Sequence, residues 1–423
     1  MVFYSRWVFC NKTYKQHLEY LKFEDTPLRG YSKRMNVKSK VNFRCLYSKG
    51  FFVSLLLAVV LFSSYFVIVF GSSVSSFVLG ASDKIVRNEV ELKHAVNNAV
   101  GSAIIALDND ITLTEQLLIP VNKDITLTST STSKFFKLIG DDLEVYFAPD
   151  YWPSTGGVIT VEGGAVLKLD GISVSNPENY RWIAAVSVSA AGTFILYSGE
   201  ISGSGVSNSG VFTMFGGTIS NCIGSGVGNS EYGTFSMSGG EISNNPGFGV
   251  INGGKYNWGW TYGMFSMSGG EIRDNDGGGV QNTGIFSMSG GEISNNVGGN
   301  LMQSGGGVSN SGVFSMSGGV ISNNQATYGG GVYNWPDGNF SLSENGVISN
   351  NNAEVGGGVY NAGIFNRWGG VISDNTATQY SNIYPNDNNI AGYTVIIVST
   401  VVTISVIVIG GLFFYFKKRV PKQ

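Results

Sequence analysis

One phrase of sequence recurs seven times between Gly205 and Asn375, with nearly constant wording and gaps of unequal length. A clear copy is GVSNSGVFSMSGGVISNN, residues 307–324. The isoleucine of this phrase recurs at intervals of 18 to 30 residues, at Ile201, Ile219, Ile242, Ile272, Ile293, Ile321, Ile348 and Ile372. A constant core with elastic gaps is typical of a solenoid, in which repeats stack on one another and length varies only in loops.

Each copy contains three strand-like stretches of three to five residues, separated by glycine, asparagine and serine. These stretches are too short for helices, and turn residues bound them. Because the strands occur in the same order in every copy, each strand is expected to pair in parallel with the equivalent strand of the next copy, about 4.8 Å away. In Phe-x-Met the two apolar side chains point the same way, into the coil. We therefore expect three walls around an apolar centre with columns of Phe, Met, Ile and Val.

Asparagine is as regular as the apolar residues. One predicted column comprises Asn208, Asn229, Asn252, Asn282, Asn310, Asn334 and Asn361. A second comprises Asn244, Asn295, Asn323 and Asn350, with Asn221 and Asp374 in register. Stacked amides at turns can hydrogen-bond along the axis and tolerate left-handed backbone. Both columns are predicted to be structural ladders rather than chelating sites, and Cys222 a tolerated variation where other coils have a second asparagine.

The consensus GGGVxNxGxFxMSGGxISNN resembles the right-handed parallel β-helix, or pectin-lyase-like, repeats of prokaryotic adhesin-like surface proteins. It is similar, more loosely, to the Gly-Gly-apolar repeats of polymorphic outer-membrane proteins. The resemblance covers residues 103–380 and implies an all-β, right-handed parallel β-helix solenoid of about ten coils. It implies no activity, because this fold hosts lyases, hydrolases, adhesins and inert stalks.

The chain before the repeats divides into three predicted parts. Residues 1–50 are a basic cytoplasmic or n-region, and we expect Met35 to be the true start, so that residues 1–34 are not native. Residues 51–71 are apolar and serve either as a signal peptide cleaved after Ala81 or as a retained signal anchor. Residues 84–100 are predicted to form a short helix that caps the solenoid, with Asn88 as its N-cap.

After the solenoid, assigned to residues 103–385, a linker (386–390) leads to an apolar stretch (391–416) and a basic tail (417–423). The apolar stretch is long enough to be a transmembrane helix. Its basic flank predicts a cytoplasmic tail and an extracellular solenoid in the cell membrane. A single apolar segment at this end, rather than an outer-membrane β-barrel, fits a cell with a single membrane, such as an archaeal or Gram-positive one.

Charge argues against nucleic acid as a partner. Residues 82–390 contain eleven Lys and Arg against twenty-six Asp and Glu, whereas a nucleic-acid surface needs a basic face. Catalytic groups are equally sparse in the sequence. Gly140-Asp141-Asp142 is the only acidic pair like that of the polygalacturonase-type enzymes, and no histidine follows His94. We therefore predict a protein that is not an enzyme, with no cofactor and no metal site, and keep a polysaccharide lyase or hydrolase as the less favoured alternative.

Three glutamates are the candidates for a weak cation site. Glu241, Glu271 and Glu292 hold one outward position in successive coils, and like charges on neighbouring strands repel. The simpler interpretation is a solvated acidic stripe, and the sharper one is weak Ca²⁺ binding.

An aromatic insertion is the candidate ligand site. Tyr256, Trp258, Trp260 and Tyr262 alternate within residues 253–263 and, if extended, present one aromatic face to a glycan or a cell-surface protein. The alternative is that the insertion folds over the flank and buries those rings. The predicted function is an adhesin-like surface protein, with a purely structural envelope or stalk protein as the alternative.

Overall fold

The computed structural model describes residues 84–141, 156–176, 183–230, 232–253, 263–298 and 304–385. The predicted apolar segments 51–71 and 391–416, and the termini beyond them, lie outside these ranges. Within the described ranges, no helix has both the length and the apolar character needed to cross a bilayer.

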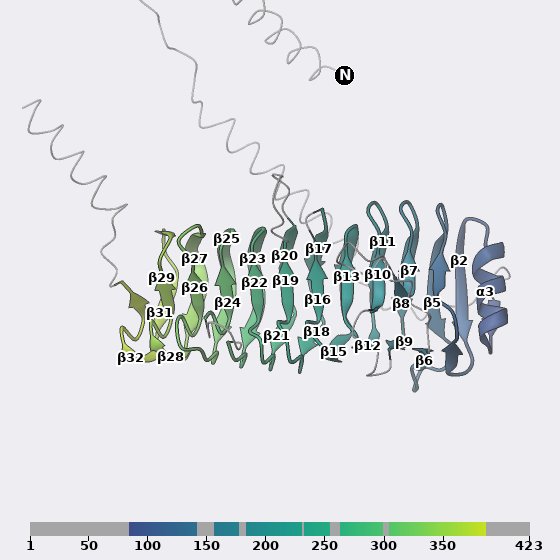
Figure 1. Ribbon diagram of the computed structural model, residues 1–423, viewed down its shortest axis with the longest axis horizontal. Helices are drawn as coiled ribbons and strands as arrows, with labels where there is room; N and C mark the ends of the chain where they lie inside the picture. The colour runs from purple at the N-terminus through teal and green to yellow at the C-terminus, as the bar shows by residue number, and fades with distance from the viewer. Residues whose placement is uncertain are drawn as a thin grey trace, which may run out of the picture. The chain divides into compact units, whose positions relative to one another are not determined.

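The described strands form a parallel β-solenoid whose coils stack along one axis (Figure 1). Each coil has three walls, which we name by their buried residues. The Val wall is an eleven-stranded sheet comprising β4 (Leu117–Ile119), β7 (Gly157–Val161), β10 (Ala184–Val188), β13 (Val206–Asn208), β16 (Val227–Asn229), β19 (Val250–Asn252), β22 (Val280–Asn282), β24 (Val308–Asn310), β26 (Val332–Asn334), β29 (Val359–Asn361) and β33 (Ile383–Tyr384).

The other two walls belong to one twenty-stranded sheet. The Phe–Met wall comprises β1 (Lys84–Val86), β2 (Ser102–Leu107), β5 (Asp124–Ser129), β8 (Val166–Asp170), β11 (Thr193–Leu196), β14 (Val211–Met214), β17 (Thr234–Met237), β20 (Met264–Met267), the first parts of β23 (Ile285–Ser294), β25 (Val313–Ser322) and β27 (Asn339–Ser349), and β30 (Ile364–Arg367). The Ile wall comprises β3 (Ile111–Leu113), β6 (Phe136–Gly140), β9 (Ile172–Ser175), β12 (Gly199–Gly203), β15 (Thr218–Cys222), β18 (Glu241–Ser243), β21 (Glu271–Arg273), the second parts of β23, β25 and β27, and β31 (Val371–Ser373). β28 (Asn352–Val355) and β32 (Thr376–Gln379) form a small parallel sheet beside them.

The parallel solenoid predicted from the repeat is confirmed. Equivalent residues pair coil by coil, as in Phe235 with Phe265 and Ile242 with Ile272. About ten coils were expected, and the Val wall contains eleven strands in the described part of the chain. The repeated phrase therefore encodes one coil, and its variable gaps fall at the corners between walls.

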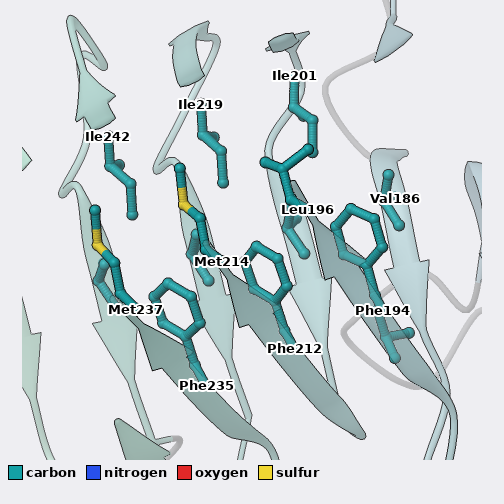
Figure 2. Packing of buried hydrophobic residues seen from close by; sticks show 14 of the residues in the cluster. Val186, Phe194, Leu196, Ile201, Phe212, Met214, Ile219, Phe235, Met237 and Ile242 are labelled. Atoms are coloured by element: carbon teal, nitrogen blue, oxygen red, sulfur yellow. The ribbon is translucent and has the colours of Figure 1, made fainter. Parts of the chain in front are cut away.

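Aromatic stacking fills the centre of the coils. Successive Phe rings from Phe194 to Phe365 stack nearly face to face, with ring centroids 4.6–4.9 Å apart (Figure 2). The Met column and the Ile column flank them, and both are buried. Stacked rings at this distance add attraction beyond the apolar area that they bury. The core is thus continuous along the axis, as the columns predicted.

A helix lies at the N-terminal end of the coils, α3 (Glu89–Asn98) (Figure 1). It is shorter than the predicted segment 84–100, because Lys84–Val86 forms β1 and pairs with β2. Asn88 is its N-cap, and the Asn88 side chain accepts a hydrogen bond from the Glu91 N–H at 2.9 Å. Leu92 and Val96 are buried against the first coils. The predicted cap is therefore present as a ten-residue helix.

Glu89 fastens this helix to the first coils. Its carboxylate accepts hydrogen bonds from the Thr114 N–H and hydroxyl at 3.1 and 2.9 Å, and it pairs with Lys93 at 2.7 Å. Burial by itself would raise the pKa of this carboxyl, but the hydrogen bonds from Lys93, Thr114 and the Glu115 backbone outweigh burial and lower the pKa of Glu89 to about 2. The cap is thus attached through an ionised carboxylate.

The last described coil ends the apolar column differently. Arg367 pairs with Leu342, so it holds the position that methionine occupies in earlier coils. Its guanidinium donates to the Gly369 and Gly370 carbonyls at 3.1 and 3.2 Å. A charged side chain that hydrogen-bonds its own corner therefore replaces the apolar residue at this end.

The Ser-Gly-Gly corner needs glycine for two reasons. The second glycine has a positive φ in successive coils, as in Gly270 (+81°) and Gly291 (+84°). A Cβ on Gly291 would also lie 2.7 Å from the Met267 methyl group of the preceding coil. Left-handed backbone favours glycine, and the Gly270 carbonyl oxygen, which would lie 2.8 Å from the same Cβ, leaves no space for a side chain.

Gly291→Ala is expected to lower the free energy of unfolding by about 1–3 kcal/mol, because it combines a strained φ with an overpacked core. Gly228→Ala is the matched control, since a Cβ there meets only the Val206 carbonyl oxygen, at 3.9 Å. Urea unfolding followed by circular dichroism measures both. Equal midpoints for the two variants would contradict this account of the corner.

Candidate functional site

The aromatic insertion leaves and re-enters the solenoid at one corner, between β19 and β20. Its four aromatic residues (Tyr256, Trp258, Trp260 and Tyr262) lie outside the described residues. On its two sides, the Gly253 N–H donates to the Asn229 carbonyl at 2.8 Å and the Met264 N–H donates to the Gly233 carbonyl at 2.9 Å. The strands on both sides keep their register with neighbouring coils. The coil is therefore complete without residues 254–262.

The same corner in the next coil is much shorter. Only Thr283 and Gly284 separate β22 from β23. Joining Gly253 directly to Gly263 would give this corner the same two-residue length. The insertion is thus an addition to the scaffold and not a part of its closure.

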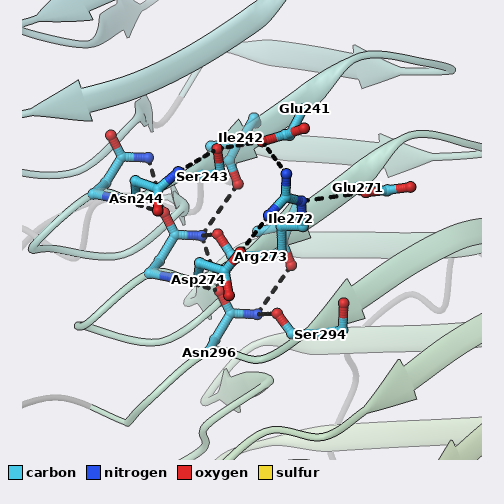
Figure 3. A network of polar contacts seen from close by, with 12 residues as sticks. Glu241, Ile242, Ser243, Asn244, Glu271, Ile272, Arg273, Asp274, Ser294 and Asn296 are labelled. Atoms are coloured by element: carbon cyan, nitrogen blue, oxygen red, sulfur yellow. Dashed lines mark hydrogen bonds and ion pairs between the residues drawn. The ribbon is translucent and has the colours of Figure 1, made fainter.

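The three stripe glutamates are in register on the Ile wall. Glu241 pairs with Glu271, and Glu271 pairs with Glu292. Figure 3 shows that the Arg273 guanidinium lies between Glu241 and Glu271. It pairs with Glu241 at 2.8 Å and with Glu271 at 3.4 Å, and it also contacts Asp274. The like charges are therefore relieved by an arginine of the chain itself.

Sequence reasoning missed this role of Arg273, although the signal was present in the phrase. Neighbouring coils have Ser243 and Ser294 at this position, and both pair with Arg273. An arginine that interrupts a serine column beside three glutamates is a charge compensation. Hydrogen bonds to Glu241 and Asp274 raise the pKa of Arg273.

Glu292 is held separately, since the Ser322 hydroxyl donates to its carboxylate at 3.2 Å. Within the described ranges, no group of three or more His, Cys, Asp or Glu side chains converges in a way that could hold a metal ion. Weak Ca²⁺ binding by the stripe stays a prediction, and in this geometry a cation would have to share Glu241 and Glu271 with Arg273.

Arg273→Ser gives this position the residue of its neighbours and tests the compensation. It is expected to cost about 1 kcal/mol or less, because the ion pairs are partly exposed, and the loss should shrink with added salt. CaCl₂ should raise the unfolding midpoint of the variant more than that of the unaltered protein, because its carboxylates have lost their arginine. Scanning calorimetry with and without CaCl₂ measures this, with the exposed Lys137→Ser as the charge control. An equal calcium response in both proteins would refute the compensation.

The first asparagine column is a continuous ladder. Each Nδ2 donates to the Oδ1 of the equivalent asparagine one coil further on, at 2.7 or 2.8 Å, from Asn208 to Asn361. Each inner amide also donates to backbone carbonyls at the corner, as Asn282 does to Val313 at 3.0 Å. Asn208 to Asn334 are fully buried. Buried amides of this kind fix the coil-to-coil register.

The second ladder lies one residue later than predicted. The predicted members Asn244, Asn295, Asn323 and Asn350 have φ values of 55° to 57°, so they supply the left-handed corner instead. The buried ladder comprises Asn245, Asn275, Asn296, Asn324, Asn351 and Asn375. The predicted positions were wrong because, in an Asn-Asn pair, the left-handed residue turns its side chain out and the next turns its side chain in.

Cys222 occupies the first position of this ladder. The Cys222 N–H donates to the Asn245 Oδ1 at 3.1 Å, as the ladder asparagines do in later coils. The thiol is buried, and burial together with the Glu200 charge raises its pKa to about 12. Cys222 therefore acts as a small buried end residue, consistent with the predicted tolerated variation.

Asn282→Ala is expected to cost about 1–3 kcal/mol, because it removes two buried ladder bonds, taking the Oδ1 acceptor from the Asn252 amide and the Nδ2 donor from the Asn310 amide. Asn361→Ala, at the half-buried end of the same column, should cost less, since it removes only one ladder bond. Chemical unfolding of both variants makes the comparison. A loss at Asn361 as large as that at Asn282 would contradict the view that burial between two amides sets the cost.

A second aromatic group lies on the last three coils. Tyr333, Tyr360 and Tyr384 hold the outward position of β26, β29 and β33, and their rings stack with centroids 4.8 and 4.7 Å apart. Three further rings meet this stack edge-on, and we call all six the terminal aromatic cluster: Tyr328, Tyr333, Trp335, Tyr360, Tyr380 and Tyr384.

Comparison of the chain with protein-family models, with curated proteins and with solved structures finds no match. The architecture alone thus defines the class: a repeat protein built as a parallel β-solenoid.

Proposed function

We propose that the chain is a membrane-anchored, adhesin-like cell-surface protein whose solenoid is a right-handed parallel β-helix of the pectin-lyase-like kind. In this proposal the apolar stretch 391–416 anchors it, the solenoid is extracellular, and the tail 417–423 is cytoplasmic. The aromatic insertion binds a glycan or a protein on another surface. The consensus phrase and the basic flanks support this assignment.

The observation that carries the binding role is the closed corner beneath the insertion. Coil closure and register are complete at Gly253 and Gly263, so the fold places no demand on the nine residues, 254–262, that lie between them. Four aromatic residues concentrated in such an addition are costly to expose unless they bind something. A rigid scaffold that carries an aromatic loop suits recognition by surface contact.

A purely structural stalk is the second candidate, and the two buried asparagine ladders favour it. They stiffen the coils from Asn208 to Asn375 and need no ligand to explain them. The two candidates differ in one respect that can be measured, because a stalk does not depend on the identity of residues 254–262.

Deletion of residues 254–262 separates the candidates. It should leave the unfolding midpoint unchanged, since the corner takes the length that Thr283 and Gly284 have in the next coil. It should abolish binding on a glycan array and to whole cells, because the aromatic face is lost. The replacement of Trp258 and Trp260 by alanine, at unaltered loop length, should reduce binding at least tenfold.

Unchanged binding after the deletion would contradict the proposed role of the insertion and favour the stalk. The loss of arrayed sugar during incubation, rather than binding to it, would instead indicate a lyase or hydrolase.

A further inference from the structure

We propose that the terminal aromatic cluster is a lipid-contact surface that seats the last coils of the solenoid on the zwitterionic headgroups of the membrane. This inference rests on the proposed anchorage by residues 391–416. It adds a second, lateral attachment, made by aromatic side chains of the folded domain.

The distance along the chain places the cluster close to the bilayer. Tyr384 belongs to β33, the last strand of the Val wall, and only six residues separate it from Ala391. A fully extended chain of this length spans at most about 25 Å. With residues 391–416 in the membrane, the coil that carries Tyr384 therefore cannot move further than that from the point of entry.

The cluster is confined to this end of the Val wall. The outward positions of five earlier strands are Ser207, Gly228, Ile251, Gln281 and Ser309, and the position becomes tyrosine only in the last three. The coils thus close with serine or glycine at this place. Closure of the coil therefore does not require tyrosine at this position, and we attribute the three consecutive tyrosines to contact with something outside the solenoid.

The chemistry of the cluster suits a headgroup layer. Tyr and Trp have an apolar ring and a polar tip, which is why they gather where a membrane meets water. Tyr328 and Tyr380 are 39% and 45% exposed. Burial and neighbouring tyrosines raise the pKa of Tyr333 and of Tyr360, so both hydroxyls stay neutral hydrogen-bonding groups. Among the described residues 304–385, Arg367 is the only Lys or Arg, and it hydrogen-bonds the Gly369 and Gly370 carbonyls, so the last coils favour zwitterionic over anionic headgroups.

The packing of the rings favours lipid over a glycan. Tyr333, Tyr360 and Tyr384 cover one another's faces, with interplanar angles of 9° and 28°. Trp335 is edge-on to Tyr333, and its indole N–H donates to the Ser309 hydroxyl at 2.9 Å. A sugar packs against an open ring face, whereas this stack offers a row of ring edges and hydroxyls to its surroundings.

The test uses the full-length protein in phosphatidylcholine nanodiscs that contain lipids with a nitroxide on the headgroup. A bimane label is attached at Ala362→Cys, two residues from Tyr360, and in a second sample at Ser209→Cys, six coils away on the same corner. Cys10 and Cys45 are changed to serine, and the buried Cys222 does not react. Quenching at position 362 should exceed that at position 209 at least threefold.

Tyr333→Ser, Tyr360→Ser and Tyr384→Ser together introduce the residue found at the same position in β13 and β24, and should abolish the excess quenching at position 362. Tyr328→Ser with Tyr380→Ser should halve the excess quenching at position 362. Because both of these side chains are exposed, this second variant tests the surface even if the first variant fails to fold. Tyr197→Ser with Phe215→Ser is the control, because these rings also stack (5.4 Å) and are exposed, but lie on distant coils. This control should leave the quenching unchanged.

Each other outcome overturns a distinct statement. A protein that does not co-elute with nanodiscs overturns the anchorage, and the lipid seat with it. A protein that is retained without excess quenching at position 362, or with quenching that survives all the tyrosine changes, overturns the seat alone. Loss of glycan-array binding in the tyrosine variants with unchanged quenching overturns it in favour of a sugar site.

Discussion

The hydrogen bond between identical buried amides on adjacent coils is the interaction on which the rest of the solenoid depends. An asparagine such as Asn282 cannot satisfy its Oδ1 within its own coil, because the donor is the Asn252 amide of the coil before. Its Nδ2 in turn needs the Asn310 Oδ1 of the coil after. A buried amide left without either partner is costly. Each coil therefore requires a neighbour in the same register.

This requirement explains why the apolar columns are so regular. Once the amides fix the register, Phe265 must lie above Phe235 and below Phe286, and the same holds for the methionines and isoleucines. The corners then become the places where a coil can differ from the next, since they lie outside the columns. The insertion before Met264 uses this freedom by adding residues. The outward positions of the walls are also free to differ, and Arg273 in β21 is a change of that kind.

Much of this architecture could be predicted from the sequence, because parallel pairing of a repeat places like on like. The Phe column and the ladder through Asn282 follow from this rule alone. The members of the second ladder could not be predicted in this way. The choice between the two residues of an Asn-Asn pair depends on the backbone φ, and the spacing of residues in the sequence does not give φ. Arg273 was missed because the glutamates were considered as a column without the residue beside them. Tyr384 lies in a strand without the usual Gly-Gly, so only the register places it in the terminal aromatic cluster.

Arg367 shows how an array of equivalent coils acquires a definite length. The internal coils of the repeat present equivalent apolar columns to one another, so their packing does not by itself determine how many coils there are. The guanidinium at the methionine position breaks this equivalence, because it ends the Met column at a charged side chain that hydrogen-bonds its own corner. The length of the solenoid can therefore change without any change in the residues at its two ends. Duplication of one internal repeat would lengthen the solenoid by about 4.8 Å and leave both ends as they are. Genes for such proteins can therefore change the length of the solenoid in steps of one whole repeat.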